Sequence, residues 1–156
     1  RSVINGANAA GIAANVAQQF EVGQQILAKG LMPILEPEIT ITIADKAEAE
    51  VLLRDEILKH LDALPDDQQV MLKLSLPDVA NHYKSLVDHP RTLTVVALSG
   101  GYPRAQSNEM LSKNTGIIAS FSRGFSEGLK VDMTDAAFDA MIAESIESIY
   151  SASIAG

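Results

Sequence analysis

The sequence contains no cysteine and no tryptophan, and its aromatic residues are four phenylalanines and three tyrosines. Without cysteine the chain has neither a disulfide framework nor a thiolate metal site. No apolar run reaches the length of a membrane-spanning helix, and the first residues do not have the pattern of a signal peptide. We therefore expect a soluble, cytoplasmic protein.

Basic residues are also scarce. The chain has 12 lysines and arginines against 20 aspartates and glutamates, a formal net charge of -8. This balance argues against nucleic acid or an anionic membrane as the main partner. Any phosphate chemistry needs a local positive site on a negative background. A length of 156 residues favours one domain. Because the chain opens with Arg1 rather than methionine, we expect a fragment or a trimmed terminus.

A short apolar run with one lysine, residues 69–77, is central to the interpretation of the chain. Its length, the polar residues before it and Pro77 at its end favour a buried strand. A lysine inside a buried strand is costly unless its charge is paired, exposed or lost. Burial favours the neutral amine, which is a nucleophile toward carbonyls. Lys73 is thus either a surface lysine that extends to solvent or a Schiff-base lysine.

Helical and strand patterns alternate along the rest of the chain. We expect helices at 5–29, 44–64, 79–87, 103–111 and 134–150, and further strands at 31–36, 93–98 and 116–121. Such alternation predicts a parallel sheet with right-handed crossovers, and strands that are apolar almost throughout are typical of a sheet covered on both faces. In the second helix, we expect an apolar face of Ala47, Val51, Ile57, Leu58 and Leu61, with Glu50 and Arg54 on the solvent side.

Polar residues gather at or just past the carboxyl ends of the predicted strands. Side chains alternate along a strand, so Glu36 and Glu38 share one face of the first strand. Ser99 comes directly after the third strand, and Arg123 comes two residues after the fourth. In parallel α/β folds this end carries the active site. The convergence of these groups with Lys73 is a stronger signal than any one of them.

The Ser99-Gly100-Gly101 turn and Arg123 are candidate anion ligands. Glycines allow the backbone N–H groups to approach an anion closely, and a guanidinium binds phosphate as a bidentate fork. Taken separately, the turn is most simply interpreted as an ordinary turn, and Arg123 as a member of a surface ion pair. Together they match eight-stranded barrels, in which the loops after strands seven and eight often bind phosphate.

Glu36 and Glu38 are compatible with a metal site, an acid-base pair or a solvated strand end. None of the three histidines lies at a predicted strand end, which disfavours a histidine-carboxylate metal site. An acid-base role beside a lysine is the more economical hypothesis, since imine formation requires several proton transfers.

Four motifs occur in the order found in one family. They are Pro-Ile-Leu-Glu-Pro-Glu at 33–38, Met-Leu-Lys-Leu at 71–74, Leu-Ser-Gly-Gly at 98–101 and Phe-Ser-Arg at 121–123. In combination they resemble the carboxyl-terminal half of a class I fructose-1,6-bisphosphate aldolase of the bacterial type. The resemblance extends over nearly the whole chain.

The resemblance implies roles for the catalytic residues. Lys73 would form the Schiff base with the keto group of the sugar bisphosphate. Glu36 would be the general acid and base that forms and resolves the imine, and Glu38 a neighbouring carboxylate that tunes the site. No metal and no cofactor are implied.

The resemblance also implies a phosphate site. Ser99, Gly100, Gly101 and Arg123 would hold one phosphate of the substrate. Ser122 would add a backbone N–H at a position where many relatives have glycine. Because the backbone makes that contact, the substitution is compatible with it.

The fold implied by the resemblance is a TIM barrel, of which residues 1–156 supply about strands 5–8 and a final helix of one domain. A full barrel typically has about 250 residues. The family's aspartate and two further lysines have no counterparts here, and Arg1 is at most a remnant of a strand-four motif. Such a half should associate with its missing amino-terminal half or with itself.

Two alternatives to a catalytic half-barrel exist. One is a phosphate-binding half-barrel that assembles but performs no chemistry, with Lys73 an ordinary protonated amine. The other is a small doubly wound domain with an open sheet, for which four strands suffice.

Overall fold

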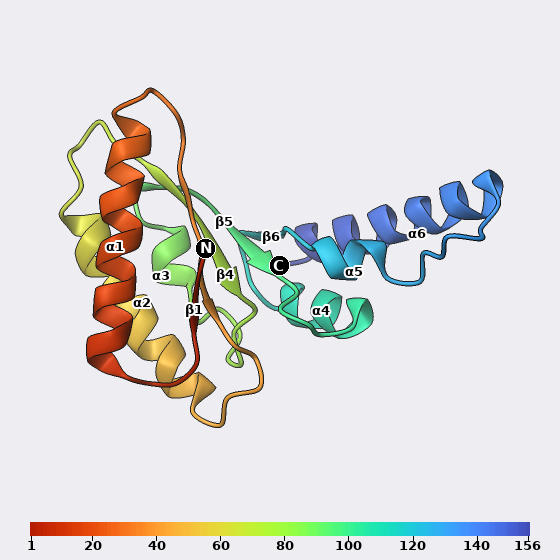
Figure 1. Cartoon of the computed structure of the whole chain (residues 1–156), viewed down its shortest axis with the longest axis horizontal. Coiled ribbons are helices and arrows are strands. Elements are labelled where there is room, and N and C mark those ends of the chain that lie inside the picture. The colour runs from red at the N-terminus through yellow and green to blue at the C-terminus, as the bar shows by residue number, and fades with distance from the viewer.

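The computed structural model describes residues 1–156 as a layered α/β unit with a long projecting helix (Figure 1). None of the helices is both long and apolar enough to cross a lipid bilayer. The strands are β1 (Ser2–Ile4), β2 (Ile34–Leu35), β3 (Pro37–Ile39), β4 (Val70–Ser75), β5 (Thr92–Leu98) and β6 (Ile117–Ala119). The helices are α1 (Ala9–Leu27), α2 (Lys46–Asp62), α3 (Lys84–Val87), α4 (Arg104–Leu111), α5 (Ser122–Ser126) and α6 (Asp135–Ile154).

All strand pairs are parallel, as the alternation of patterns predicts. Four strands form one sheet in the order β2-β4-β5-β6, and β1 pairs separately with β3. The predicted strand 31–36 is shortened to β2, and the short strand β3 that follows it has a different partner. The sequence patterns do not reveal β1, and the predicted helix 79–87 is shortened to α3.

One face of the sheet forms the core. Leu72, Val95 and Ile117 lie in register across three strands, and none is more than 3% exposed. Helices α1 and α2 pack side by side next to this core (Figure 1). Asn8 begins α1, where its side chain accepts a hydrogen bond from the Gly11 N–H at 2.8 Å.

The opposite face of the sheet is open at both sides of Lys73. Lys73 lies in register with Val96, and Val96 with Ile118, which is 47% exposed. Ile34, in register with Met71 on the same face, is 50% exposed. The expectation that both faces are covered is therefore wrong for this chain, because no element packs over the face that carries Lys73.

The apolar side of α6 is also partly exposed. Thr134 begins the helix and accepts a hydrogen bond from the Ala137 N–H. The helix begins at the end far from the sheet and runs back toward it, and Ser153 near its end accepts a hydrogen bond from the Ala119 N–H (Figure 1). Phe138 is 44% exposed and Ile146 is 54% exposed, whereas Ile149 packs against the core, so the apolar side of α6 is only partly covered by this chain.

Helix α2 buries a charged pair that the apolar pattern did not predict. Its core face is Ala49, Leu53, Ile57 and Leu61, whereas Val51 is 41% exposed. Lys46 and Glu50, 4% and 1% exposed, form an ion pair on that face. The Lys46 ammonium also donates to the Leu76 carbonyl at 3.0 Å and to Asp78 at 2.6 Å, so α2 holds the segment that follows β4.

Replacement of Lys46 by methionine should destabilise the chain. Glu50 would remain buried without its partner, which typically costs about 3 kcal/mol or more. Urea unfolding measures this loss, and Lys113→Met, which removes an exposed pair with Glu109, should have no measurable effect. Equal midpoints for the two variants would contradict a stabilising role of the buried pair.

The pH dependence of this contribution has a defined sign. Burial lowers the pKa of Lys46, but the hydrogen bonds to Asp78 and Glu50 outweigh burial and leave the pKa raised above 10.5. Since the folded pKa exceeds the unfolded one, the contribution is fully present below the unfolded pKa and is lost only as the pH rises through the folded value. The destabilisation of Lys46→Met should therefore be constant across neutral pH.

Candidate active site

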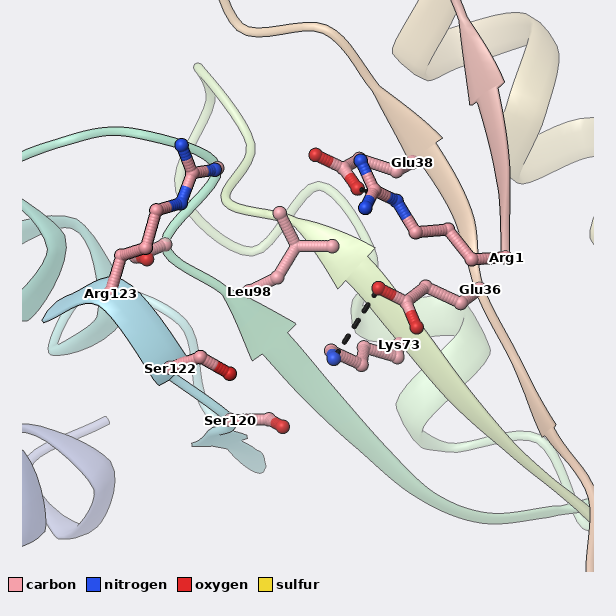
Figure 2. A pocket seen from close by; sticks show the side chains of 10 residues that line it. Arg1, Glu36, Glu38, Lys73, Leu98, Ser120, Ser122 and Arg123 are labelled. Carbon is pink, nitrogen blue, oxygen red and sulfur yellow. Dashed lines mark ion pairs between the residues drawn. The ribbon is translucent and has the colours of Figure 1, made fainter. Parts of the chain in front are cut away.

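A polar cavity of about 170 Å³ lies at the carboxyl ends of the strands (Figure 2). Leu98 is the only hydrophobic residue among the ten that line it. The lining residues are Arg1, Glu36, Glu38, Lys73, Leu98, Ser99, Gly100, Ser120, Ser122 and Arg123.

Lys73 and Glu36 form an ion pair at one side of this cavity. The Lys73 ammonium nitrogen lies 3.3 Å from Oε1 of Glu36 (Figure 2). Each of the two side chains is 21% exposed. Lys73 projects from the open face of β4, while Val70, Leu72 and Leu74 of the same strand are buried in the core. The predicted strand is present as β4, but it is buried on one face only, and Lys73 is partly accessible.

Glu38 forms a second ion pair in the same cavity. Its carboxylate, 12% exposed, lies 2.7 Å from Nε of Arg1, which is 58% exposed. Glu36 and Glu38 thus share one side of the cavity, as the alternation along the strand predicts, but each carboxylate has its own cation. With Arg123, the cavity holds three basic and two acidic side chains, a local positive excess on a chain of net charge -8.

The Ser99–Gly101 turn follows β5, and its first two residues line the same cavity as Lys73. The Tyr102 N–H donates to the Ser99 carbonyl at 2.9 Å and closes the turn. Gly100 and Gly101 have φ angles of +63° and +114°, which favour glycine. Their N–H groups have no hydrogen-bond partner within the chain. This turn offers free backbone donors to an anion.

Arg123 lies beside this turn. It has no ion-pair partner, and a Cβ built on Gly101 would lie 3.7 Å from its Nη1. Ser122 and Arg123 both line the cavity from α5 (Figure 2). An uncommitted guanidinium next to unsatisfied N–H groups is a suitable arrangement for a phosphate.

Seven of the eight residues predicted from the sequence and the resemblance line this cavity. Gly101 does not line it, although it lies against Arg123. Leu98 and Ser120 line the cavity and were not predicted, although each is a chain neighbour of a predicted position or motif. Arg1, considered in the sequence only as a remnant of a motif, lines the cavity and forms an ion pair with Glu38. Its place depends on β1, which is too short for a sequence pattern to reveal.

Comparison with known proteins agrees with the fold. The parallel strands and their helices are consistent with half of a (β/α)₈ barrel, the class of protein that the sheet and its strand-end cavity indicate. The chain is 57% identical over 154 residues to a class 1 fructose-bisphosphate aldolase of Synechocystis sp. and 54% identical to one of Porphyromonas gingivalis. Each match covers 99% of this chain. No family model matches the sequence.

The extent of these matches is as important as their identity. The chain spans about half the length of the two curated relatives, 51% and 52% respectively. The resemblance to class I fructose-bisphosphate aldolases seen in the four motifs is therefore confirmed, as a similarity that extends over nearly all of this chain and about half of each relative.

The close fit of the turn at Gly100 gives a testable prediction. A Cβ at Gly100 would lie 2.7 Å from Cγ2 of Ile41, so Gly100→Ala must displace the turn. Loss of the aligned N–H donors should weaken binding of inorganic phosphate by about tenfold, the value of one charge-assisted hydrogen bond. Titration followed by ³¹P NMR measures this affinity.

Gly30→Ala is the matched control for this substitution. Gly30 also has a positive φ, +74°, but a Cβ there meets no atom within 4 Å. Both variants carry the cost of a left-handed alanine, about 1–2 kcal/mol, and only Gly100→Ala moves the turn. The same phosphate affinity in both variants would exclude the turn as the anion site.

Proposed function

We propose that this chain supplies the imine-forming lysine, its acid-base partner and one phosphate site of a class I aldolase that cleaves fructose 1,6-bisphosphate. The observation that carries the proposal is that the Lys73–Glu36 pair lines one cavity with Gly100, whose N–H has no partner within the chain. The names of the two relatives support the choice of substrate. A cytoplasmic location and a place in glycolysis form part of the same proposal.

In this reaction the neutral amine of Lys73 adds to the keto carbon of the sugar bisphosphate to give a carbinolamine. Loss of water gives a protonated imine. The bond between C3 and C4 then breaks as the C4 hydroxyl loses its proton, and the electron pair passes into the iminium to form an enamine. Glyceraldehyde 3-phosphate leaves first, and protonation and hydrolysis of the enamine release dihydroxyacetone phosphate and free Lys73.

Each step assigns a task to a residue of the cavity. Glu36, 3.3 Å from the lysine nitrogen, is within reach to donate and accept the protons of imine formation and hydrolysis. Glu38 and Arg1 form a second ion pair in the same cavity as Lys73. Ser99, Gly100 and Arg123, with the backbone of Ser122 and the flexibility of Gly101, hold a phosphate and so fix the keto carbon relative to Lys73.

Residues 1–156 are then half of one barrel domain, and the partner of the chain is the other half. The exposed apolar surface supports this proposal. Besides the open face around Lys73, a groove of about 390 Å³ lies between β6, α5 and α6. We call this the β6–α6 groove; it is lined by Ile118, Ala119, Phe125, Ile146, Ile149, Tyr150, Ser153 and Ile154. Surface of this kind is typical of an interface rather than of a monomer.

Borohydride trapping tests the assignment of Lys73. The complex of this chain with the amino-terminal half of the Synechocystis relative, incubated with dihydroxyacetone phosphate and borohydride, should form a stable secondary amine on the peptide that contains Lys73. Lys73→Met should abolish the adduct and lower kcat by at least about a thousandfold, since the nucleophile is removed. Lys59→Met, on the exposed side of α2, should retain both.

An adduct on another lysine would refute the role of Lys73. Phosphate binding by the complex without adduct or turnover would instead favour the non-catalytic half-barrel, in which Lys73 remains a protonated partner of Glu36. Turnover by the 156-residue chain alone at the rate of the complex would show that the other half is dispensable.

A charged residue in the β6–α6 groove should prevent assembly. Ile118→Lys places an ammonium on the open face, where docking would bury it without a partner, and should weaken association with the amino-terminal half by at least about tenfold. Val131→Lys, at a residue that is fully exposed away from the groove, is the matched control. Isothermal calorimetry measures both affinities, and equal values would exclude the groove from the interface.

A further inference from the structure

The strand that carries Glu36 changes partner at that residue. Through Leu35 the strand pairs with β4, and from Pro37 onward it pairs with β1. Glu36 lies between the two ladders, so its own N–H bonds to neither strand. Pro37 has no N–H to donate, which favours a break at this point. The Ser2 N–H of β1 donates to the Glu36 carbonyl at 3.0 Å, so the N–H of the candidate acid-base residue is the one backbone group there without a partner in either ladder.

The side chain of Gln19 on α1 supplies the partner of the Glu36 N–H. Its Oε1 accepts a hydrogen bond from the Glu36 N–H at 3.3 Å, and its Nε2 donates to the Glu36 carbonyl at 3.4 Å. One amide group thus satisfies the Glu36 N–H and adds a second, longer hydrogen bond to the carbonyl, which also accepts from the Ser2 N–H. The same Nε2 donates to the Ser2 hydroxyl at 2.7 Å.

Gln19 is itself held in place. Its neighbours along the buried side of α1, Val16 and Phe20, are 1% and 6% exposed, so the helix cannot shift without disturbing the core. Ser2 donates to Asn15 at 2.7 Å, one helical turn before Gln19. The network therefore fixes Glu36 relative to a rigid helix, and it also fixes the residue that follows Arg1.

We propose that Gln19 is a positioning residue that holds the carboxylate of Glu36 within reach of the Lys73 nitrogen. This inference rests on the proposed function for its consequence in catalysis, but not for its geometry. Gln19 does not line the cavity and has no contact with a substrate there. Its effect acts through the backbone of Glu36, whose side chain spans the remaining 3.3 Å to Lys73.

Zero-length crosslinking tests the geometry in the chain itself, without need of activity. A water-soluble carbodiimide joins a carboxylate to an adjacent amine as an amide, and mass spectrometry of peptides measures the yield of the 36–73 link. In Gln19→Met this yield should fall about fivefold, the population change expected when a hydrogen bond of ordinary strength no longer favours one arrangement. The link between Lys113 and Glu109, 2.8 Å apart on α4 and the residues after it, is the internal reference.

Gln18→Met is the matched control, because Gln18 is the exposed neighbour on the same helix and makes no hydrogen bond through its side chain. Its 36–73 yield should equal that of the unchanged chain. A second variant, Gln19→Glu, retains the acceptor for the Glu36 N–H and loses the donors, so its yield should be intermediate. Equal yields in Gln19→Met and Gln18→Met would overturn the proposal, and so would a fall of the reference link in parallel with the 36–73 link.

Steady-state kinetics of the complex with the amino-terminal half separate positioning from mere packing. Gln19→Met should lower kcat by roughly tenfold or more, since a small misplacement of an acid-base group is costly, and leave KM within about twofold because the phosphate site is untouched. If Gln19→Met and Gln18→Met changed kcat and KM by the same factors, the positioning role of Gln19 would also be overturned. If the 36–73 yield falls as expected but no complex forms an imine at Lys73, the positioning of Glu36 is sustained and the proposed reaction alone is refuted.

Discussion

The ion pair between Lys73 and Glu36 is the interaction on which the candidate site depends. It requires β4 and the break between β2 and β3 to lie side by side, although 37 residues separate the two partners in the chain. Because both side chains are partly exposed, their attraction is screened by water and modest in free energy. Enclosure in a dry cavity would favour the neutral forms of both groups. Low polarity penalises charged groups and so favours transfer of a proton from an ammonium to a carboxylate. What covers this face of the sheet therefore decides whether the lysine is a counter-ion or a nucleophile.

Much of the site was predictable because two physical regularities act locally. Alternation of side chains along a strand places Glu36 and Glu38 on one face, and the carboxyl ends of parallel strands meet at one edge of the sheet. These two rules brought Lys73, the Ser99–Gly101 turn and Arg123 to one place before any contact was known. The resemblance to the aldolases added the roles, which neither periodicity nor spacing supplies.

The features that the sequence did not reveal all depend on partners distant in the chain. Strand β1 has three residues, and its stability comes from β3, more than thirty residues away. At Glu36 the chain stops pairing with β4 and begins pairing with β1, and the pattern of apolar residues does not show which strand is the partner. The buried face of α2 differs from the one expected from the sequence for a related reason. Lys46 and Glu50 are buried because they bond to each other and to the segment after β4, and a pattern that assigns charges to solvent cannot detect such a pair.

The open apolar surface and the candidate site are the same face of the sheet. Ile34 precedes Glu36 by two residues and shares its side of the strand, and Ile118 lies in register with the neighbour of Lys73. Any element that buries these two isoleucines must also cover the ion pair between them. Burial of apolar side chains is favourable at about 25 cal/mol per Å², whereas dehydration of a lysine and a carboxylate is not. Assembly with the other half of the barrel would therefore supply the free energy that drives water from the lysine. Under the proposed function, the contacts that complete the fold are therefore also the contacts that make the Lys73 amine reactive.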